Sequence, residues 1–436
     1  MHCSAAIGVC TGFLHCWEQV AREKVEMQQM QHAAEILRDE FGVPHIYAET
    51  EHDLFFLHGF CQAEDRLWQM EGLRRVAAGR VSEMMGPVAL TVDKFARTLG
   101  WSRRAAEEWR LLCSSDDANS TKAVAMLRAY CDGVNAFIDQ AAAQGGRGNM
   151  LNGGPLPFFF MLLKIDPEPW RPEDTLGILR VLCYQMNHGG QHPAIRQLLA
   201  NIVGEDDALR WSRTDCDPTT GKEWPPTRPS AAAGRASVPT ANPTAQYSAG
   251  CATTVPDELL RRTLAGQPSE RDLPSQGQGS NWWALGSERT STKGPLLAND
   301  PHLSVRVPSI WYESHLHAND TGLHTAGVQM PGFPVTIIGH NEKVCIGVTL
   351  GYTDTEDLFI ERFVGKKDAR LGHSTSYMHE GLVKEVQTHE ETIAVKGETE
   401  PVVVTVAETV HGPIVSQCAG NHDGAYDVAR ADAVAA

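Results

Sequence analysis

A proline-rich run near the middle of the chain, residues 212–279, limits what the rest can fold into. It holds nine of the 24 prolines together with many Ser, Thr and Ala residues. Such a composition cannot bury enough apolar surface to offset the entropy lost when a segment becomes ordered. The core must therefore come from the parts on either side. The run itself is either a long linker or a spacer peptide that is excised, and its end at Gly279 favours the spacer.

The part before this run is mainly helical in pattern. A strand is predicted over residues 43–48 and a loop over the Gly- and Asn-rich residues 141–155. We expect Gly79 to interrupt the longest helix. The helices are predicted over residues 18–38, 51–85, 107–112, 122–140 and 175–200.

The part from Ser280 onward is rich in short strands. Many short strands after a helical first half are typical of an α+β layered fold. The strands are predicted over residues 282–285, 296–298, 310–317, 324–329, 335–339, 344–348, 358–363, 392–395 and 402–410.

The start of this second part, Gly279-Ser280, carries a candidate nucleophile. A serine with a free α-amino group combines nucleophile and base on one residue, because an α-amine has a pKa of about 7.7–8.0. The simpler alternative is a turn that leads into a strand. Neither a GxSxG nucleophile elbow nor an HExxH zinc helix occurs in the chain.

Several segments in order resemble one enzyme family. The stretches GSNWWALGSERT (279–290), GPLLANDPHL (294–303) and PSIWYESHL (308–316) are similar to the β-chain start of the penicillin acylase family of N-terminal-nucleophile amidohydrolases. Residues 42–86, from GVPHIYA to SEMMG, resemble the opening of its α-chain. The similarity runs from about Asp39 to about Val415, so it is more specific than any single motif.

The resemblance implies a four-layer αββα sandwich and two chains made from one precursor. We expect an N-terminal extension with a helix over 1–38, an α-chain-like region over 39–211 and a partial β-chain-like region over 280–436. Residues 212–279 would be the spacer of this zymogen. The Ser280 hydroxyl would cleave the Gly279–Ser280 bond by an N→O acyl shift, and the freed Ser280 would then attack the amide bond of a small N-acyl substrate.

The resemblance also assigns the groups around the serine. One oxyanion donor would be the backbone N–H of Leu350, in TLGYTDTED. The family's second donor, an asparagine side chain, has no match here, which leads us to expect a C-terminally incomplete chain or impaired catalysis. A histidine at the position of His302 marks the cephalosporin-acylase and acyl-homoserine-lactone-acylase branches of the family, where it lies beside the serine. The alternative is that His302 is a loop histidine hydrogen-bonded to the backbone. Asn299 and Asp300 are expected to order the turn.

The acyl pocket is predicted from the same resemblance. Phe160 and Met186 lie in the region that helps to line it, with core packing as the alternative. Leu303 and Val348 replace an aromatic and a small polar residue of the phenylacetyl-preferring members. This more aliphatic wall favours medium or long aliphatic N-acyl substrates, such as N-acyl homoserine lactones.

A structural calcium ion is a further expectation. Asp354, Glu356 and Asp357 cluster closely, and carboxylate oxygens are the ligands Ca²⁺ prefers. The family's additional α-chain carboxylate has no counterpart in residues 186–197, so a solvated acidic turn is the alternative. Catalysis itself is expected to need no cofactor.

Composition narrows the function classes. The net charge of −16, without a basic stripe, argues against nucleic-acid binding, and no apolar run approaches the ~20 residues of a membrane span. The eleven cysteines show no CxxC spacing, and the N-terminus lacks the basic and apolar regions of a signal peptide. Members of the family are often exported, so the compartment stays open. The sequence predicts an amide hydrolase, and the alternative is a truncated or inactive homologue that keeps the fold.

Overall fold

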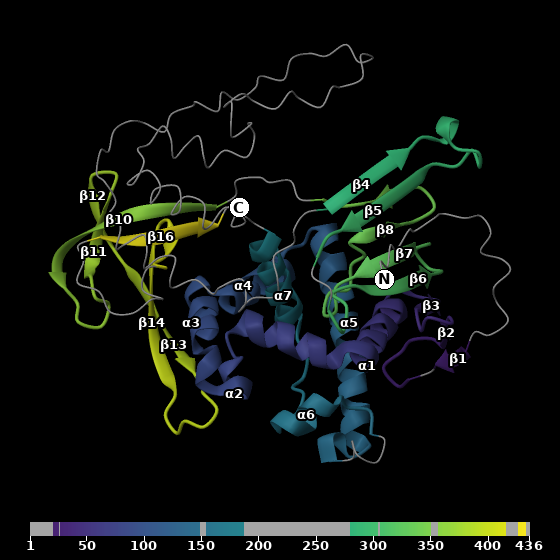
Figure 1. Ribbon diagram of the computed structural model, residues 1–436, viewed down its shortest axis with the longest axis horizontal. Coiled ribbons are helices and arrows are strands. Elements are labelled where there is room, and N and C mark those ends of the chain that lie inside the picture. The colour runs from purple at the N-terminus through teal and green to yellow at the C-terminus, as the bar shows by residue number, and fades with distance from the viewer. Residues whose placement is uncertain are drawn as a thin grey trace, which may run out of the picture. The chain divides into compact units, whose positions relative to one another are not determined.

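The computed structural model describes residues 21–25, 27–148, 154–186, 280–303, 306–349, 356–415 and 426–432. Helices dominate before residue 187 and strands after residue 280, which confirms the α+β class (Figure 1). The chain divides into two compact units. The first takes in residues 1–187, 268–352 and 389–406, and the second takes in 188–267, 353–388 and 407–436.

The helices of the described residues lie in the first unit, and the longest of them is α1 (Glu51–Ala78). Thr50 caps its start, because its hydroxyl accepts a hydrogen bond of 3.1 Å from the Asp53 N–H. Gly79 ends it in the left-handed conformation, at φ 61°. The others are α2 (Ser82–Met85), η1 (Gly86–Ala89), α3 (Leu90–Leu99), α4 (Trp101–Ser114), α5 (Ala118–Ala143), α6 (Phe158–Leu163), α7 (Pro172–Met186) and η3 (Ser287–Arg289).

Helices α1 and α5 cross closely because each has a glycine at the crossing. A Cβ on Gly59 would lie 2.1 Å from the Tyr130 carbonyl oxygen, and one on Gly133 would lie 1.7 Å from the Phe56 carbonyl oxygen. Around the crossing, apolar side chains of α1, α5, α6 and α7 form one core cluster, which includes Phe60, Met70, Val134, Phe160 and Ile178.

A seven-stranded sheet lies beside α1, with the order β1-β2-β3-β6-β7-β8-β9. One face packs Ile36, Ile46 and Leu316 against Leu54 and Leu57 of α1. All neighbours are antiparallel except β3 and β6, which pair in parallel. The strands are β1 (Ala21–Val25), β2 (Ala34–Arg38), β3 (Pro44–Ala48), β6 (Tyr312–Ala318), β7 (His324–Gln329), β8 (Ile338–His340) and β9 (Cys345–Ile346).

The helix predicted over residues 18–38 is wrong. Strands β1 and β2 form an antiparallel pair here, and β2 continues the pairing with β3. Ala34 and Ile36 are buried on the α1 side of the sheet, whereas Glu35 is not. The good helix formers of this segment were misleading because pairing and burial outweigh intrinsic propensity.

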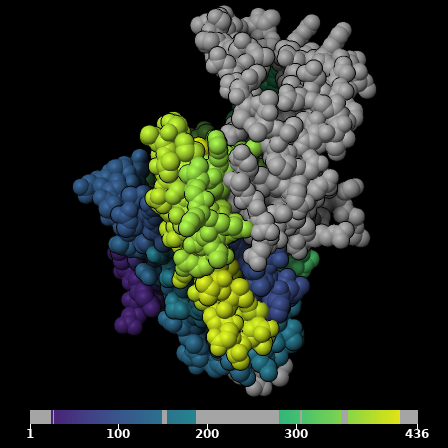
Figure 2. Space-filling view, turned by 90° about the vertical axis from the view of Figure 1, so that its left-hand side faces the viewer, coloured from purple at the N-terminus to yellow at the C-terminus, as the bar shows by residue number. Residues whose placement is uncertain are grey.

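The second unit is β-rich and contains a four-stranded sheet with the order β12-β11-β10-β16. Its strands are β10 (Glu356–Lys367), β11 (Ser374–His379), β12 (Leu382–Glu385) and β16 (Tyr426–Asp432). A separate three-stranded sheet has the order β13-β14-β15. Its strands are β13 (Gln387–Ile393), β14 (Val402–Thr409) and β15 (Gly412–Pro413), and most of β13 and β14 falls within residues 389–406 of the first unit. Strands β10 to β14 belong to the light-green to yellow surface in Figure 2.

Most predicted strands after Ser280 are present, with shifted ends. Strands β11, β12, β15 and β16 were not predicted. The four-layer stacking stays a prediction, and the spacer region lies outside the described residues. In the part of the chain that the structure describes, no helix has the length and apolar character to cross a membrane.

Candidate active site

The site is built on a two-stranded hairpin, β4 (Ser280–Leu285) and β5 (Leu296–Pro301). Its antiparallel register runs from Ser280 opposite Pro301 to Leu285 opposite Leu296. The connecting turn is tied by Thr290, a buried residue whose hydroxyl donates a 2.7 Å hydrogen bond to the Gly294 carbonyl. Because Ser280 and Pro301 pair, the first residue of β4 lies next to the residues that follow β5.

His302 follows Pro301 directly, so the hairpin carries it to the same end as Ser280. Its Nε2 lies 3.2 Å from Asn281 Nδ2 and 3.1 Å from Asp300 Oδ2. Nε2 must hold a hydrogen to donate to Asp300, and it must hold a lone pair to accept from Asn281. The two contacts therefore favour opposite tautomers of the half-exposed ring, so a rearrangement of either neighbour would switch the role of this nitrogen.

Asn299 connects the hairpin to the segment that follows β9. Its Oδ1 accepts a 2.8 Å hydrogen bond from the Val348 N–H. Its Nδ2 donates to the Val348 carbonyl at 3.0 Å and to the Asn281 carbonyl at 2.9 Å. One side chain thus holds three backbone groups from two segments.

The predicted pocket residues lie on different elements of the structure. Leu303 is partly buried just beyond the hairpin, and Val348 is joined to the hairpin through Asn299. Met186 is the last residue of α7. Phe160 is fully buried in the core and makes an edge-to-face contact with Trp68, at 5.2 Å between ring centroids. For Phe160 the structure therefore matches the core-packing alternative.

Other predicted residues lie outside the described part of the chain. These are Gly279, Leu350 and Asp354. Glu356 and Asp357 are the first two residues of β10. Within the described ranges, no group of three or more His, Cys, Asp or Glu side chains is arranged to hold a metal ion. Calcium at residues 354–357 stays a prediction.

A chain of histidine rings crosses the sheet face opposite α1, and sequence patterns did not single it out. His315 Nδ1 lies 3.2 Å from His45 Nδ1, and its Nε2 lies 2.6 Å from His324 Nε2. His324 also contacts the Glu342 carboxylate. Burial, followed by the neighbouring His324 and His45, lowers the pKa of His315 to about 3. The ring is therefore neutral at physiological pH, as expected where each N–N contact has room for one hydrogen.

The alternation of side chains along β6 could have indicated that the histidines share one face of the sheet. His315 and His317 are two residues apart, so their side chains leave the same side of the strand. The partners of β6 could not be read from the sequence, because the pairing with β3 joins residues 270 positions apart.

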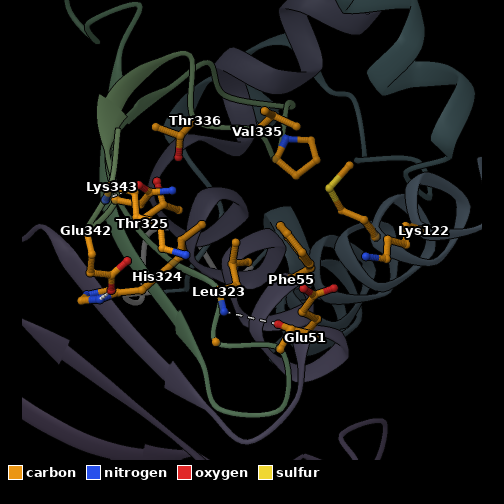
Figure 3. Close-up of a pocket in the computed structure, with 16 residues that line it drawn as sticks. Glu51, Phe55, Lys122, Leu323, His324, Thr325, Val335, Thr336, Glu342 and Lys343 are labelled. Atoms are coloured by element: carbon orange, nitrogen blue, oxygen red, sulfur yellow. Dashed lines mark hydrogen bonds and ion pairs between the residues drawn. The ribbon is translucent and has the colours of Figure 1, made fainter. Parts of the chain in front are cut away.

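A cavity of about 520 Å³ lies in the first unit, lined by residues of α1, α5 and the β6–β9 region (Figure 3). Phe55 and Leu316 are among the apolar residues of its lining, and Lys122, His324 and Glu342 supply polar groups. Neither Ser280 nor the predicted acyl-pocket residues line it, so it is distinct from the hairpin site.

Comparison with known proteins identifies the class. The model of the penicillin amidase family matches residues 33–435. The chain therefore belongs to the penicillin amidase family, a family of amide hydrolases.

Individual relatives agree with this family. The chain is 32% identical to penicillin acylase 2 proenzyme of Pseudomonas sp. (strain SE83), over 87% of this chain and 43% of the relative. It is 28% identical to acyl-homoserine lactone acylase QuiP of Pseudomonas aeruginosa, over 88% of this chain and 40% of the relative. The chain thus spans less than half the length of the curated relatives that it matches.

A solved structure, thermostable penicillin G acylase from Alcaligenes faecalis, is 22% identical with a TM-score of 0.34. The match covers 50% of this chain and 100% of that chain. A match at this TM-score does not support a fold assignment, so the assignment relies on the helices and strands described above.

Proposed function

We propose that the chain is an acylase, an amide hydrolase whose nucleophile is Ser280 after cleavage of the Gly279–Ser280 bond. The observation that carries this proposal is the hairpin register. Ser280 is the first residue of β4 and pairs with Pro301, so His302 and Asn281 stand at the end of the hairpin where a new N-terminus would be. Family membership and a relative named as a proenzyme support the same reading.

Processing would begin when the Ser280 hydroxyl attacks the Gly279 carbonyl. The C–N bond breaks, the acyl group moves to oxygen, and water hydrolyses the resulting ester. This frees the α-amine of Ser280 and leaves a carboxylate on Gly279. A glycine before the serine permits the twisted peptide that this step needs.

Turnover would use the same serine. The α-amine accepts the hydroxyl proton while Oγ attacks the carbonyl of an N-acyl amide, and the proton passes to the leaving amine. Water then hydrolyses the acyl-enzyme. The Leu350 N–H is the proposed oxyanion donor, and His302 is proposed to order Asn281 beside the nucleophile.

The arrangement of chains follows from this chemistry. Residues 39–211 would form the α-type chain and residues 280–436 the β-type chain, with residues 212–279 as the spacer. The two chains would build the four-layer sandwich, and Asp354, Glu356 and Asp357 would hold a structural Ca²⁺.

Mass spectrometry of the expressed, folded chain tests the processing step. We expect a fragment that begins at Ser280. Ser280→Ala should stay intact, and Ser280→Cys should still be cleaved because a thiol can make the same acyl shift. Ser291→Ala, an exposed serine of the connecting turn, is the matched control and should be cleaved like the wild type. A folded wild-type chain that stays whole would contradict self-processing and favour an inactive homologue.

The acyl preference is a separate proposal. The exposed aliphatic side chain of Val348 lies near the hairpin, and Leu303 follows His302. Each buried methylene contributes about 0.8 kcal/mol, so kcat/KM should rise with acyl length. A p-nitroanilide series from acetyl to dodecanoyl, with phenylacetyl alongside, measures this on processed enzyme. Best turnover of phenylacetyl, or rates that do not change with length, would refute the preference and leave Ser280 as nucleophile.

A further inference from the structure

The Asn299 side chain takes the place of a strand partner. Its amide meets both backbone groups of Val348, at 2.8 Å to the N–H and 3.0 Å to the carbonyl. In an antiparallel β-sheet, a residue of a hydrogen-bonded pair likewise uses both its backbone N–H and its carbonyl to bond to one partner residue. Asn299 thereby joins the segment after β9 to the hairpin, although residues 299 and 348 are 49 positions apart.

The three bonds determine the orientation of the amide. Nδ2 faces two carbonyl oxygens, of Val348 and Asn281, and Oδ1 faces an N–H. A flipped amide would place its oxygen against both carbonyls, so this network accepts one orientation. An aspartate here could accept from the Val348 N–H but would direct a carboxylate oxygen at two carbonyl oxygens.

The residue before Val348 is small enough to allow this close approach. A Cβ on Gly347 would lie 3.2 Å from both Cβ and Oδ1 of Asn299 and 3.3 Å from its Cγ. These distances are shorter than ordinary van der Waals contact, so a Cβ at residue 347 would require the Asn299 amide to shift by a few tenths of an ångström.

The position of this clamp relates it to the proposed chemistry. The Asn281 carbonyl belongs to the residue after the proposed nucleophile, and Val348 lies two residues before the proposed oxyanion donor. One amide therefore connects the backbone that carries Ser280 to the backbone that leads to Leu350. A shift of about 1 Å between such groups can lower the rate about 100-fold, because reacting atoms must be held in a near-attack geometry.

We propose that Asn299 is a positioning residue that holds the Val348 backbone against β4, at the residue that follows Ser280. This inference rests on the proposed function for its catalytic consequence. The clamp itself is a property of the fold. Asn299 acts through the backbone of both segments.

Two readouts test the clamp, and the first does not depend on activity. Hydrogen exchange of the peptide that contains the Val348 amide should be at least tenfold faster in Asn299→Ala than in the wild type. Asn319→Ala, which removes an exposed asparagine bonded to His317 and Glu49, is the matched control and should leave that exchange rate unchanged. Equal exchange in Asn299→Ala and wild type would overturn the clamp.

The second readout is the separation of kcat from KM on processed wild type and variants. Loss of one oxyanion donor lowers kcat about 10²–10³-fold, and we expect a fall of about 10–100-fold in Asn299→Ala with KM within about threefold. Asn299→Asp, which retains one of the three bonds, should also lose kcat. Gly347→Ala should give a smaller loss in the same direction, whereas Gly294→Ala in the hairpin turn should not.

The outcomes separate this inference from the proposed function. An active wild type with unchanged kcat in Asn299→Ala would overturn the positioning role and leave Ser280 as nucleophile. An unprocessed or inactive wild type would count against the proposed function, and the exchange rates would still decide whether Asn299 holds Val348.

Discussion

Glu71 shows what a single buried carboxylate does at the residue scale. It is 1% exposed, and its two oxygens accept hydrogen bonds from Arg74 at 2.7 Å and from Arg75 at 2.5 Å. Both arginines are themselves buried. Removal of the Glu71 charge leaves two buried guanidinium groups without one of their counter-charges. This lowers the free energy of unfolding far more than the loss of an exposed counter-charge does.

We predict that Glu71→Gln lowers the free energy of unfolding by about 3–5 kcal/mol. Glu64→Gln, on the same helix, removes an exposed carboxylate that pairs with Arg38 and should cost about 1 kcal/mol or less. Urea unfolding of both variants measures the difference. Similar small losses in the two would mean that Glu71 is not the charge that holds this network.

The predictability of the site depends on sequence separation. The sequence indicated Ser280 through the Gly279-Ser280 junction and His302 through the family resemblance, and the structure places both at one end of a short hairpin. The Asn299 clamp could not be predicted, because it connects residues 49 positions apart and its partner is a backbone group that has no residue signature. Asn299 was expected to order a local turn, and local patterns do not reveal such distant partners.

At the scale of elements, the crossing of α1 and α5 depends on Gly59. We predict that Gly59→Ala destabilises the fold by about 1–3 kcal/mol or more, because the added Cβ would lie 2.1 Å from the Tyr130 carbonyl oxygen and the helices must separate. Gly72→Ala is the control on the same helix, since no neighbouring atom among the described residues lies within 4 Å of its added Cβ.

This control should stabilise the protein by up to about 1 kcal/mol, because alanine has the higher helix propensity. Thermal or urea unfolding of both variants decides the matter. Equal effects would show that the glycine crossing is not a tight contact.

The histidine chain links strands β3, β6 and β7, and it gives this sheet a pH dependence. Folded His315 has a pKa of about 3, whereas the ordinary pKa of a histidine, as in the unfolded chain, is 6.5. The unfolded chain therefore binds a proton below pH 6.5 that folded His315 does not bind. Stability from this group is present above pH 6.5 and is lost as pH falls towards 3.

We predict that the wild type loses up to about 1.4 kcal/mol per pH unit from this group between pH 6 and pH 4. His315→Gln should reduce that slope, and His317→Gln, on the same strand and face, should reduce it less. Urea unfolding at pH 6.5, 5.5 and 4.5 provides the slopes. Equal slopes in His315→Gln and wild type would exclude His315 as the titrating group.

The elements themselves were predictable to different degrees. Helices α1 and α5 were predicted because both segments carry apolar residues at helical spacing, and α1 ends at Gly79 within the longer stretch that was predicted. Strands β1 and β2 were missed because their sequence favours a helix and only the pairing with β3 makes them strands. Strand β16 pairs with β10 across about 70 positions, beyond the reach of local patterns.

At the scale of the molecule, the first unit is assembled from segments on both sides of the proline-rich run. Strand β3 pairs in parallel with β6, from His45 opposite His315 to Ala48 opposite Ala318. Side chains of α1 reinforce this junction. Gln69 and Arg66 each donate a 2.9 Å hydrogen bond to the Ser309 carbonyl, and the Gly332 N–H donates a 3.0 Å bond to buried Gln62. A sheet and a core that both parts share should survive a break in the chain between them.

We therefore predict that the two parts stay associated after the chain is cut between residues 212 and 279. A protease site inserted after Gly234 makes the test independent of self-processing. After cleavage, the two fragments should co-elute in size-exclusion chromatography under native conditions and separate in 6 M guanidinium (~6 M lies beyond the unfolding midpoint of most mesophilic domains). The paired strands and the α1 contacts supply the attraction, and the covalent link adds only loop-closure entropy that grows slowly with its length.

Gln62→Leu, which removes the partner of the buried Gly332 N–H, should weaken the association, whereas Glu64→Gln should not. Fragments that separate without denaturant would show that the shared sheet does not hold the two parts together.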